Sequence, residues 1–127
     1  QLLSTGNDQI LLTERGASFG YYQLVADMRA IPIMKSLGFP VIFDATHIVR
    51  IYGVPSKDPG GGEPGFVPTL VYAGVAAGCN ALFLETDPCV DEALCDASSM
   101  IPLDKLKPLL KRAIALGALV RSWEEAV

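Results

Sequence analysis

Four side chains that could carry chemistry stand at or soon after the ends of apolar segments: Arg15, His47, Glu85 and Asp96. His47 is the only histidine, and a histidine with two carboxylates can hold a divalent cation through one nitrogen and two oxygens. Proton transfer and a purely structural role are the alternatives for His47. The guanidinium of Arg15 is a permanent cation whose planar fork suits a phosphate or a carboxylate, or else a salt bridge at the surface.

Three apolar segments precede these side chains, and each predicts a β-strand that is covered on both faces. They are residues 9–13, 40–44 and 81–85. Active sites of α/β folds lie beyond the carboxyl ends of parallel strands. The sequence therefore predicts a catalytic α/β sheet with its site at that edge.

Helices and loops are predicted between the strands. Apolar spacing predicts helices over residues 21–35, 66–77 and 103–125. Pro32 is expected to kink or restart the first helix. The Gly/Pro-rich residues 53–65 are predicted to form a mobile loop that covers the site, and residues 87–100 a polar loop.

The order of elements, β-α-β-loop-α-β-loop-α, fits two architectures. An open flavodoxin-like sheet suits a chain of 127 residues, but it usually needs about five strands. A (β/α)8 barrel needs about 250 residues, and three βα units are three-eighths of one. Such a piece leaves two unpaired strand edges and an exposed apolar face, so we expect it to be unstable alone.

Composition excludes several classes of protein. With 50% hydrophobic and 19% charged residues, a packed core is expected and disorder is not. A net charge of −4 argues against nonspecific nucleic-acid binding. No apolar run approaches the roughly 18–20 residues of a membrane span. An odd number of cysteines, Cys79, Cys89 and Cys95, suggests reduced thiols and a cytoplasmic location.

Four motifs follow one another along the chain. They are Leu12-Thr13-Glu14-Arg15-Gly16, Val41-Ile42-Phe43-Asp44-Ala45-Thr46-His47, Phe83-Leu84-Glu85-Thr86 and Glu92-Ala93-Leu94-Cys95-Asp96-Ala97. Together they resemble the 3-deoxy-D-manno-octulosonate 8-phosphate synthase family, and the resemblance covers nearly the whole chain. It implies that residues 1–127 are a single partial domain, the C-terminal three βα units of a (β/α)8 TIM barrel.

The resemblance also implies a reaction and roles for the four side chains. The family condenses phosphoenolpyruvate with D-arabinose 5-phosphate and water, giving the eight-carbon sugar acid phosphate and inorganic phosphate for lipopolysaccharide biosynthesis. Arg15 and His47 would bind substrate, and His47, Glu85 and Asp96 match catalytic residues that are also metal ligands. The metal would be Mn, Zn or Fe. The fourth ligand of metal-dependent members is a Cys on the first strand of the barrel, which an Asn replaces in metal-independent members. That position is not in this chain, so both classes stay open. Full-length members are tetramers, which implies a homo-oligomer.

Three positions depart from the family pattern: Arg50 stands where Gln is usual, Pro64 where Arg is usual and Asp87 where His is usual. Two alternatives remain, the related 3-deoxy-arabino-heptulosonate 7-phosphate synthase and a catalytically inert truncated barrel. The heptulosonate enzymes typically read Ile-Arg-Thr-Phe after Arg-Gly, where this chain continues with Ala17 and Ser18. This difference favours the octulosonate synthase. The chain alone is predicted to be inactive.

Overall fold

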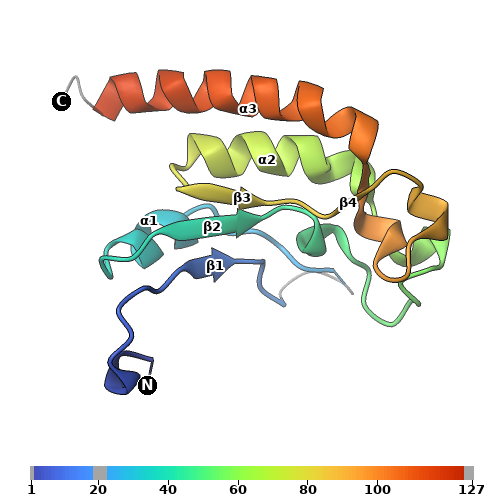
Figure 1. The fold of residues 1–127 in the computed structure, drawn as a ribbon, viewed down its shortest axis with the longest axis horizontal. Helices are drawn as coiled ribbons and strands as arrows, with labels where there is room; N and C mark the ends of the chain where they lie inside the picture. Colours follow the sequence, from blue (N-terminus) through green and yellow to red (C-terminus); the bar gives the residue numbers. More distant parts are fainter. Residues whose placement is uncertain (1, 19–22, 125–127) are drawn as a thin grey trace.

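A computed structural model describes residues 2–18 and 23–124 and shows a parallel sheet with helices packed against it (Figure 1). The strands of this sheet are β1 (Leu12–Glu14), β2 (Val41–Asp44) and β3 (Ala81–Phe83). β2 lies in the middle and pairs in parallel with both neighbours. The predicted parallel α/β sheet is confirmed, and the carboxyl ends of its strands meet at one edge.

All three strands were predicted to be covered on both faces, but even in the central strand Ile42, which faces away from Val41 and Phe43, is only partly buried. Val41 and Phe43 of β2 are fully buried, and the ring of Phe43 lies so close to Gly74 that a Cβ at Gly74 would overlap it. The outer strands are half exposed, with Leu11 beside β1 at 61% and Phe83 of β3 at 47% exposure. The structure therefore has the exposed apolar surface that was expected of three βα units.

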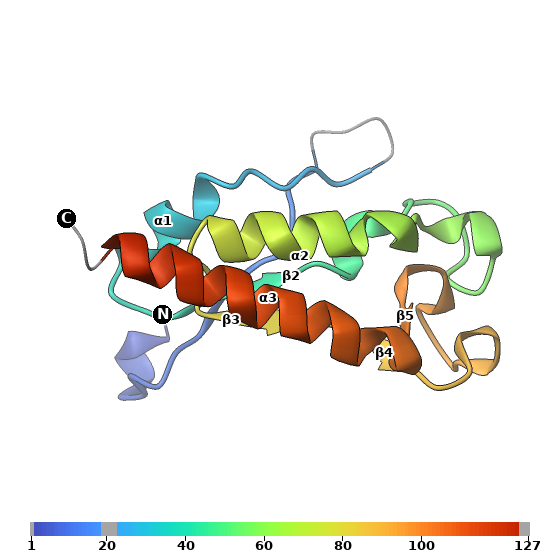
Figure 2. The same cartoon turned by 90° about the horizontal axis from the view of Figure 1, so that it is seen from above.

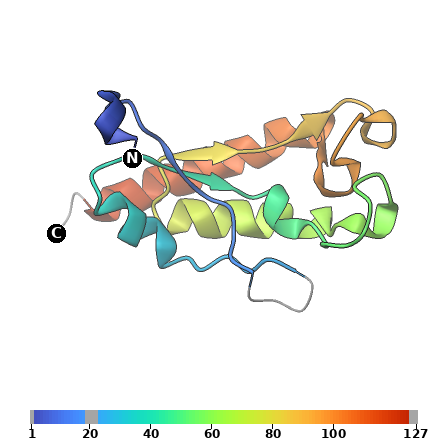
Figure 3. The same ribbon diagram turned by 90° about the horizontal axis from the view of Figure 1, so that it is seen from below.

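Two helices cover one face of the sheet. α2 (Val67–Ala76) and α3 (Leu103–Glu124) lie side by side there (Figure 2), close to their predicted ranges. Leu109, Ala113 and Val120 are buried members of the apolar stripe of α3. From the opposite side, β2 and β3 lie in front of these helices (Figure 3). No helix of the described residues is long and apolar enough to cross a membrane.

The first predicted helix, over residues 21–35, is much shorter in the structure. α1 covers only Ala30–Lys35; the first two residues of the prediction lie outside the described residues. Val25 instead forms an antiparallel bridge with Ala17, and apolar residues of this stretch pack against the core without a helix. Pro32 falls in the first turn of α1, where its missing N–H breaks no helical hydrogen bond.

A second parallel sheet interrupts the predicted polar loop. It consists of β4 (Thr86–Asp87) and β5 (Ile101–Pro102). Strands of two residues leave no periodic signal in a sequence, so this pair was missed. The pairing joins the two ends of the loop that contains Asp96, and it holds the base of that loop beside the end of β3.

The Gly/Pro-rich loop is packed against the rest of the chain, which differs from the mobile lid predicted from its glycines. The amide of Ile51 donates to the Gly61 carbonyl at 2.9 Å. A Cβ at Gly61 would lie 2.9 Å from the Ser98 hydroxyl, and one at Gly62 would overlap the Ser98 carbonyl. These glycines permit two loops to pack closely, and one of those loops carries Asp96.

Candidate functional site

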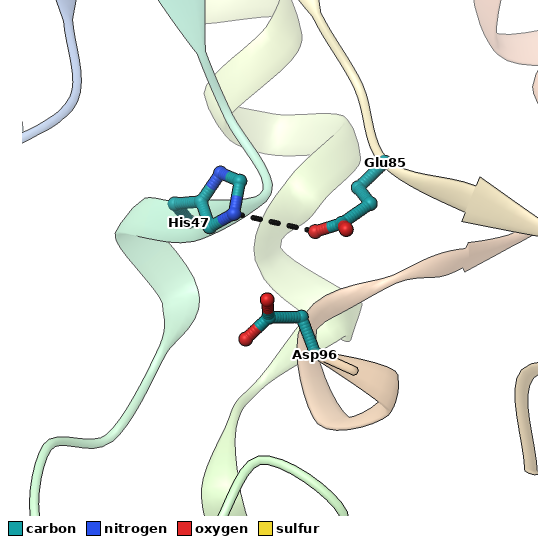
Figure 4. Close-up of side chains that lie close together, drawn as sticks. All are labelled: His47, Glu85 and Asp96. Atoms are coloured by element: carbon teal, nitrogen blue, oxygen red, sulfur yellow. Dashed lines mark ion pairs between the residues drawn. The ribbon is translucent and has the colours of Figure 1, made fainter. Parts of the chain in front are cut away.

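Three of the four predicted side chains come together beyond the carboxyl ends of the strands (Figure 4). His47 lies in the turn after β2, Glu85 lies between the end of β3 and the start of β4, and Asp96 comes from the loop between β4 and β5. One nitrogen or oxygen atom of each lies within 4.8 Å of the other two. The His47 Nε2 is 3.3 Å from the Glu85 Oε2.

Asp44 fixes the orientation of the His47 ring. Its Oδ2 lies 2.7 Å from the His47 Nδ1, and its Oδ1 accepts a hydrogen bond from the His47 backbone amide at 3.0 Å. The Asp44 side chain is only 5% exposed. When the imidazole is neutral and its Nδ1 donates to this carboxylate, the lone pair of Nε2 faces Glu85.

Thr46 links the ends of the two strands. Its fully buried hydroxyl donates to the Asp44 Oδ1 at 3.1 Å and accepts from the Glu85 backbone amide at 3.2 Å. One hydroxyl therefore acts both as a donor and as an acceptor, and it holds the turn that carries His47 next to Glu85.

The Glu85 carboxylate lies in an electrostatically unfavourable position. Burial raises the pKa of Glu85 above its ordinary value; the charge of His47 opposes this shift, and the carboxylates of Asp96 and Asp44 add to it. Within the described part of the chain, the buried Oε2 of Glu85 accepts no hydrogen bond, although the His47 Nε2 lies nearby.

This arrangement fits a divalent cation. The Nε2 lone pair of a neutral His47 and an unpartnered oxygen of Glu85 face each other, and a third ligand atom from Asp96 is close. A proton or a cation between them would remove the repulsion. One imidazole nitrogen and two carboxylates suit Zn, Mn or Fe, and the carboxylate behind the histidine is the usual support of such a ligand.

The fourth predicted residue, Arg15, lies beside this cluster. Its Nε is 3.8 Å from the Asp44 Oδ2, and its Nη1 donates to the Tyr52 hydroxyl at 3.3 Å. The side chain is 48% exposed. Arg15 thus makes a weak ion pair with the carboxylate that orients His47, and much of its guanidinium remains accessible to an anion.

The sequence profile of the DAHP synthetase I family matches residues 1–121. The chain belongs to this family. Three similar relatives are each named 2-dehydro-3-deoxyphosphooctonate aldolase. The protein of Syntrophotalea carbinolica is 48% identical over 126 residues, which are 99% of this chain and 45% of the relative. That of Trichlorobacter lovleyi is 50% identical over 95% of this chain and 44% of the relative. That of Nitratidesulfovibrio vulgaris is 52% identical over 94% of this chain and 43% of the relative.

Membership of the DAHP synthetase I family agrees with the fold. The crystal structure of phospho-2-dehydro-3-deoxyheptonate aldolase (DAHP synthase) from Thermotoga maritima superimposes with a TM-score of 0.77 at 26% sequence identity, over 94% of this chain and 33% of that chain. The chain spans less than half the length of the curated relatives that it matches.

The sequence reasoning missed three residues of the site in this DAHP synthetase I family member. Asp44 and Thr46 were read only as parts of a motif, although an aspartate three positions before a histidine at a strand end is a recognisable signal. Arg50 was noted only as a departure from the family pattern. Its guanidinium donates to the Ser98 hydroxyl at 2.9 Å and lies 3.6 Å from an oxygen of Asp96.

Proposed function

We propose that this chain is the C-terminal three βα units of a (β/α)8 barrel, and that it supplies part of the active site of a 3-deoxy-D-manno-octulosonate 8-phosphate synthase. The reaction would condense phosphoenolpyruvate with D-arabinose 5-phosphate and water. The observation that carries the proposal is the convergence of His47, Glu85 and Asp96 at the carboxyl edge of a parallel sheet. Relatives that are 48% to 52% identical and are named for this activity support it.

In this proposal the chain's own residues position substrate and move a proton. The half-exposed Arg15 binds an anionic group of phosphoenolpyruvate, because its charge is permanent and its fork matches a carboxylate or phosphate. Asp44 and Thr46 hold His47 and Glu85 in a fixed geometry. His47 and Glu85, 3.3 Å apart, can pass a proton between them or to substrate.

A divalent cation would be held by the Nε2 of His47 and by carboxylate oxygens of Glu85 and Asp96. When bound, it would act as a Lewis acid toward a substrate oxygen. The fourth ligand position belongs to the first strand of the barrel, outside these three units. The metal-dependent and metal-independent classes are therefore both compatible with the residues of this chain.

The open edges of the sheet support the partial-barrel part of the proposal. Within the described residues, β1 and β3 each pair on one side only, and Phe83 and Leu11 leave apolar surface uncovered. Neighbouring strands of a complete barrel would satisfy those edges. We therefore propose that the chain alone lacks synthase activity. The family resemblance supports the further proposal that a complete protein is a homo-oligomer, a tetramer, and the three cysteines support a cytoplasmic location.

A chimaera tests this proposal. The matching 45% of the Syntrophotalea carbinolica relative would be replaced by this chain, and phosphate release from phosphoenolpyruvate would be measured with arabinose 5-phosphate or erythrose 4-phosphate. We expect release that depends on arabinose 5-phosphate and is lost in Arg15→Ala and His47→Ala. Arg112→Ala, on the exposed side of α3, is the matched control and should retain activity.

Three results would contradict the proposal. A folded chimaera without activity would favour the inert barrel. A dependence on erythrose 4-phosphate would favour the heptulosonate enzyme. Activity of the isolated chain would overturn the partial-barrel proposal.

A further inference from the structure

The guanidinium of Arg50 is held next to the candidate cation site by several contacts. Its Nη1 donates to the Ser98 hydroxyl at 2.9 Å, and its Nη2 donates to the Val54 carbonyl at 3.4 Å. The same Nη1 lies 3.6 Å from the Asp96 Oδ1. Only 15% of the Arg50 side chain is exposed, so its charge is screened less by solvent than that of a surface arginine.

The backbone of Arg50 is fixed as well. Its amide donates to the His47 carbonyl at 3.3 Å, which ties it to the turn that carries the histidine. Arg50 also forms an antiparallel bridge with Gly62 in the packed Gly/Pro-rich loop. The positive charge therefore has a defined position relative to His47 and Asp96, which a mobile surface side chain would not have.

The backbone of Asp96 has an unusual conformation. Among the described residues, Asp96 is the only non-glycine residue with a positive φ, at 48°. Residues other than glycine adopt this left-handed conformation only at a cost in free energy. The loop around it is held by the Arg50–Ser98 hydrogen bond and by the amide of Ser98, which donates to the Ser56 carbonyl at 3.1 Å. These contacts hold the carboxylate of Asp96 near His47 and Glu85 without a cation.

We propose that Arg50 is a built-in counter-ion of the site, which weakens the binding of a divalent cation because it pairs with the carboxylate of Asp96. With a neutral His47, the two carboxylates of Glu85 and Asp96 bring a formal charge of −2 to a cation, and Arg50 offsets one of these charges. Like charges a few ångströms apart in a partly buried site repel strongly. This inference rests on the cation site of the proposed function.

A Mn²⁺ titration of the full chain tests this proposal, with isothermal calorimetry as the readout and circular dichroism to check the fold. Arg50→Gln removes the charge and retains a polar side chain. We expect it to bind Mn²⁺ at least about tenfold more tightly than the unmodified chain, since a neighbouring like charge is removed. Arg50→Met is a second neutral variant that keeps an apolar stem, in case the amide disturbs the fold.

Three controls separate the local effect from a general one. Arg112→Gln removes the same charge from the exposed side of α3 and should leave Mn²⁺ affinity unchanged. Arg50→Lys keeps the charge and should stay close to the unmodified chain. The double variant Arg50→Gln/Asp96→Asn should lose the gain, because the ligand that Arg50 faces is gone.

The outcomes distinguish this proposal from the site on which it rests. If the neutral Arg50 variants bind Mn²⁺ no more tightly than the unmodified chain, while His47→Ala abolishes binding, the counter-ion role is wrong and the cation site stands. If the folded chain and its neutral Arg50 variants all fail to bind Mn²⁺, the cation site and the counter-ion role are both wrong.

Discussion

The two strands that lead into the site differ in how firmly the rest of the chain holds them. β2 is central, its Val41 and Phe43 are fully buried, and the turn after it is fixed by hydrogen bonds around Asp44 and Thr46. β3 is an edge strand with Phe83 half exposed. The residues that follow it include Glu85, with an oxygen that accepts no hydrogen bond from the described residues, and Asp96, with a positive φ.

This difference shows that the half of the site beside β2 is preorganised before any ligand binds. His47 is oriented by buried groups that need nothing further, as a preorganised ligand requires. Arg50 offsets the charge of Asp96, whereas burial and the neighbouring carboxylates disfavour the charge of Glu85, which a proton or a cation would balance. The half beside β2 should therefore respond to core and hydrogen-bond mutations, and the half beside β3 to charge, pH and added metal.

The largest expected difference between the two strands is the loss of stability when a packed aromatic ring is removed from each. Phe43→Ala should destabilise the chain by about 3–5 kcal/mol, because a fully buried ring is removed. Phe83→Ala on the half-exposed edge should cost about 1–1.5 kcal/mol, since only about half of the ring is buried. Urea unfolding followed by circular dichroism measures both. Equal losses would show that β2 is no better supported than β3.

The second largest effect should be that of the His47 orientation on Mn²⁺ affinity. Asp44→Asn keeps the shape but replaces the carboxylate that faces the His47 Nδ1. We expect Mn²⁺ affinity to fall by about 10–100-fold, the usual cost of losing the group behind a ligating histidine. Asp58→Asn, in the Gly/Pro-rich loop, makes the same chemical change at an exposed side chain as a control. If Asp44→Asn binds as tightly as the unmodified chain, Asp44 does not position the histidine.

The Thr46 hydroxyl, which links the ends of the two strands, should make a smaller contribution to the free energy of unfolding. Thr46→Val keeps the side-chain volume but removes the hydroxyl that joins Asp44 to the Glu85 amide. The expected loss is about 1–3 kcal/mol, because buried polar groups are left without a partner. Thr13→Val, on exposed β1, should change the free energy of unfolding by no more than about 0.5 kcal/mol. Thermal unfolding of the pair decides whether the buried hydroxyl is needed.

The smallest expected effect concerns pH. Burial raises the pKa of Glu85, and the carboxyl must be deprotonated to bind a cation. Above the raised pKa the carboxylate is present and affinity is full; as the pH falls through that pKa, affinity is lost. As the pH is lowered, Mn²⁺ affinity should therefore begin to fall at a higher pH than an ordinary glutamate would cause. Glu85→Gln cannot titrate and should show a shallower decline, and equal slopes would exclude a contribution from Glu85.

The sequence predicted correctly the elements whose apolar residues form a clear pattern, either a continuous run or a helical stripe. β2 was predicted because an apolar run, Val41 to Phe43, ends in polar residues, and α3 because its apolar stripe persists over many turns. The first helix was overextended because apolar spacing near Val25 matched a helix, while a tertiary bridge to Ala17 determined the backbone.

The site was predictable only where local motifs name it. His47 and Glu85 follow strand ends, and parallel pairing brings those ends together whatever the intervening sequence. The contact of Arg50 with Asp96 depends on how two loops pack through Gly61, Gly62 and Ser98. No spacing rule encodes such packing, so this part of the site required the structure.

The central claim is that His47, Glu85 and Asp96 hold a divalent cation. The most direct measurement is a crystal structure of the chain soaked in Mn²⁺, with the anomalous signal used to locate the metal. We predict a peak within coordination distance of the His47 Nε2 and of carboxylate oxygens of both acidic residues. A well-ordered site without such a peak at saturating Mn²⁺, or a peak only elsewhere, would contradict the claim.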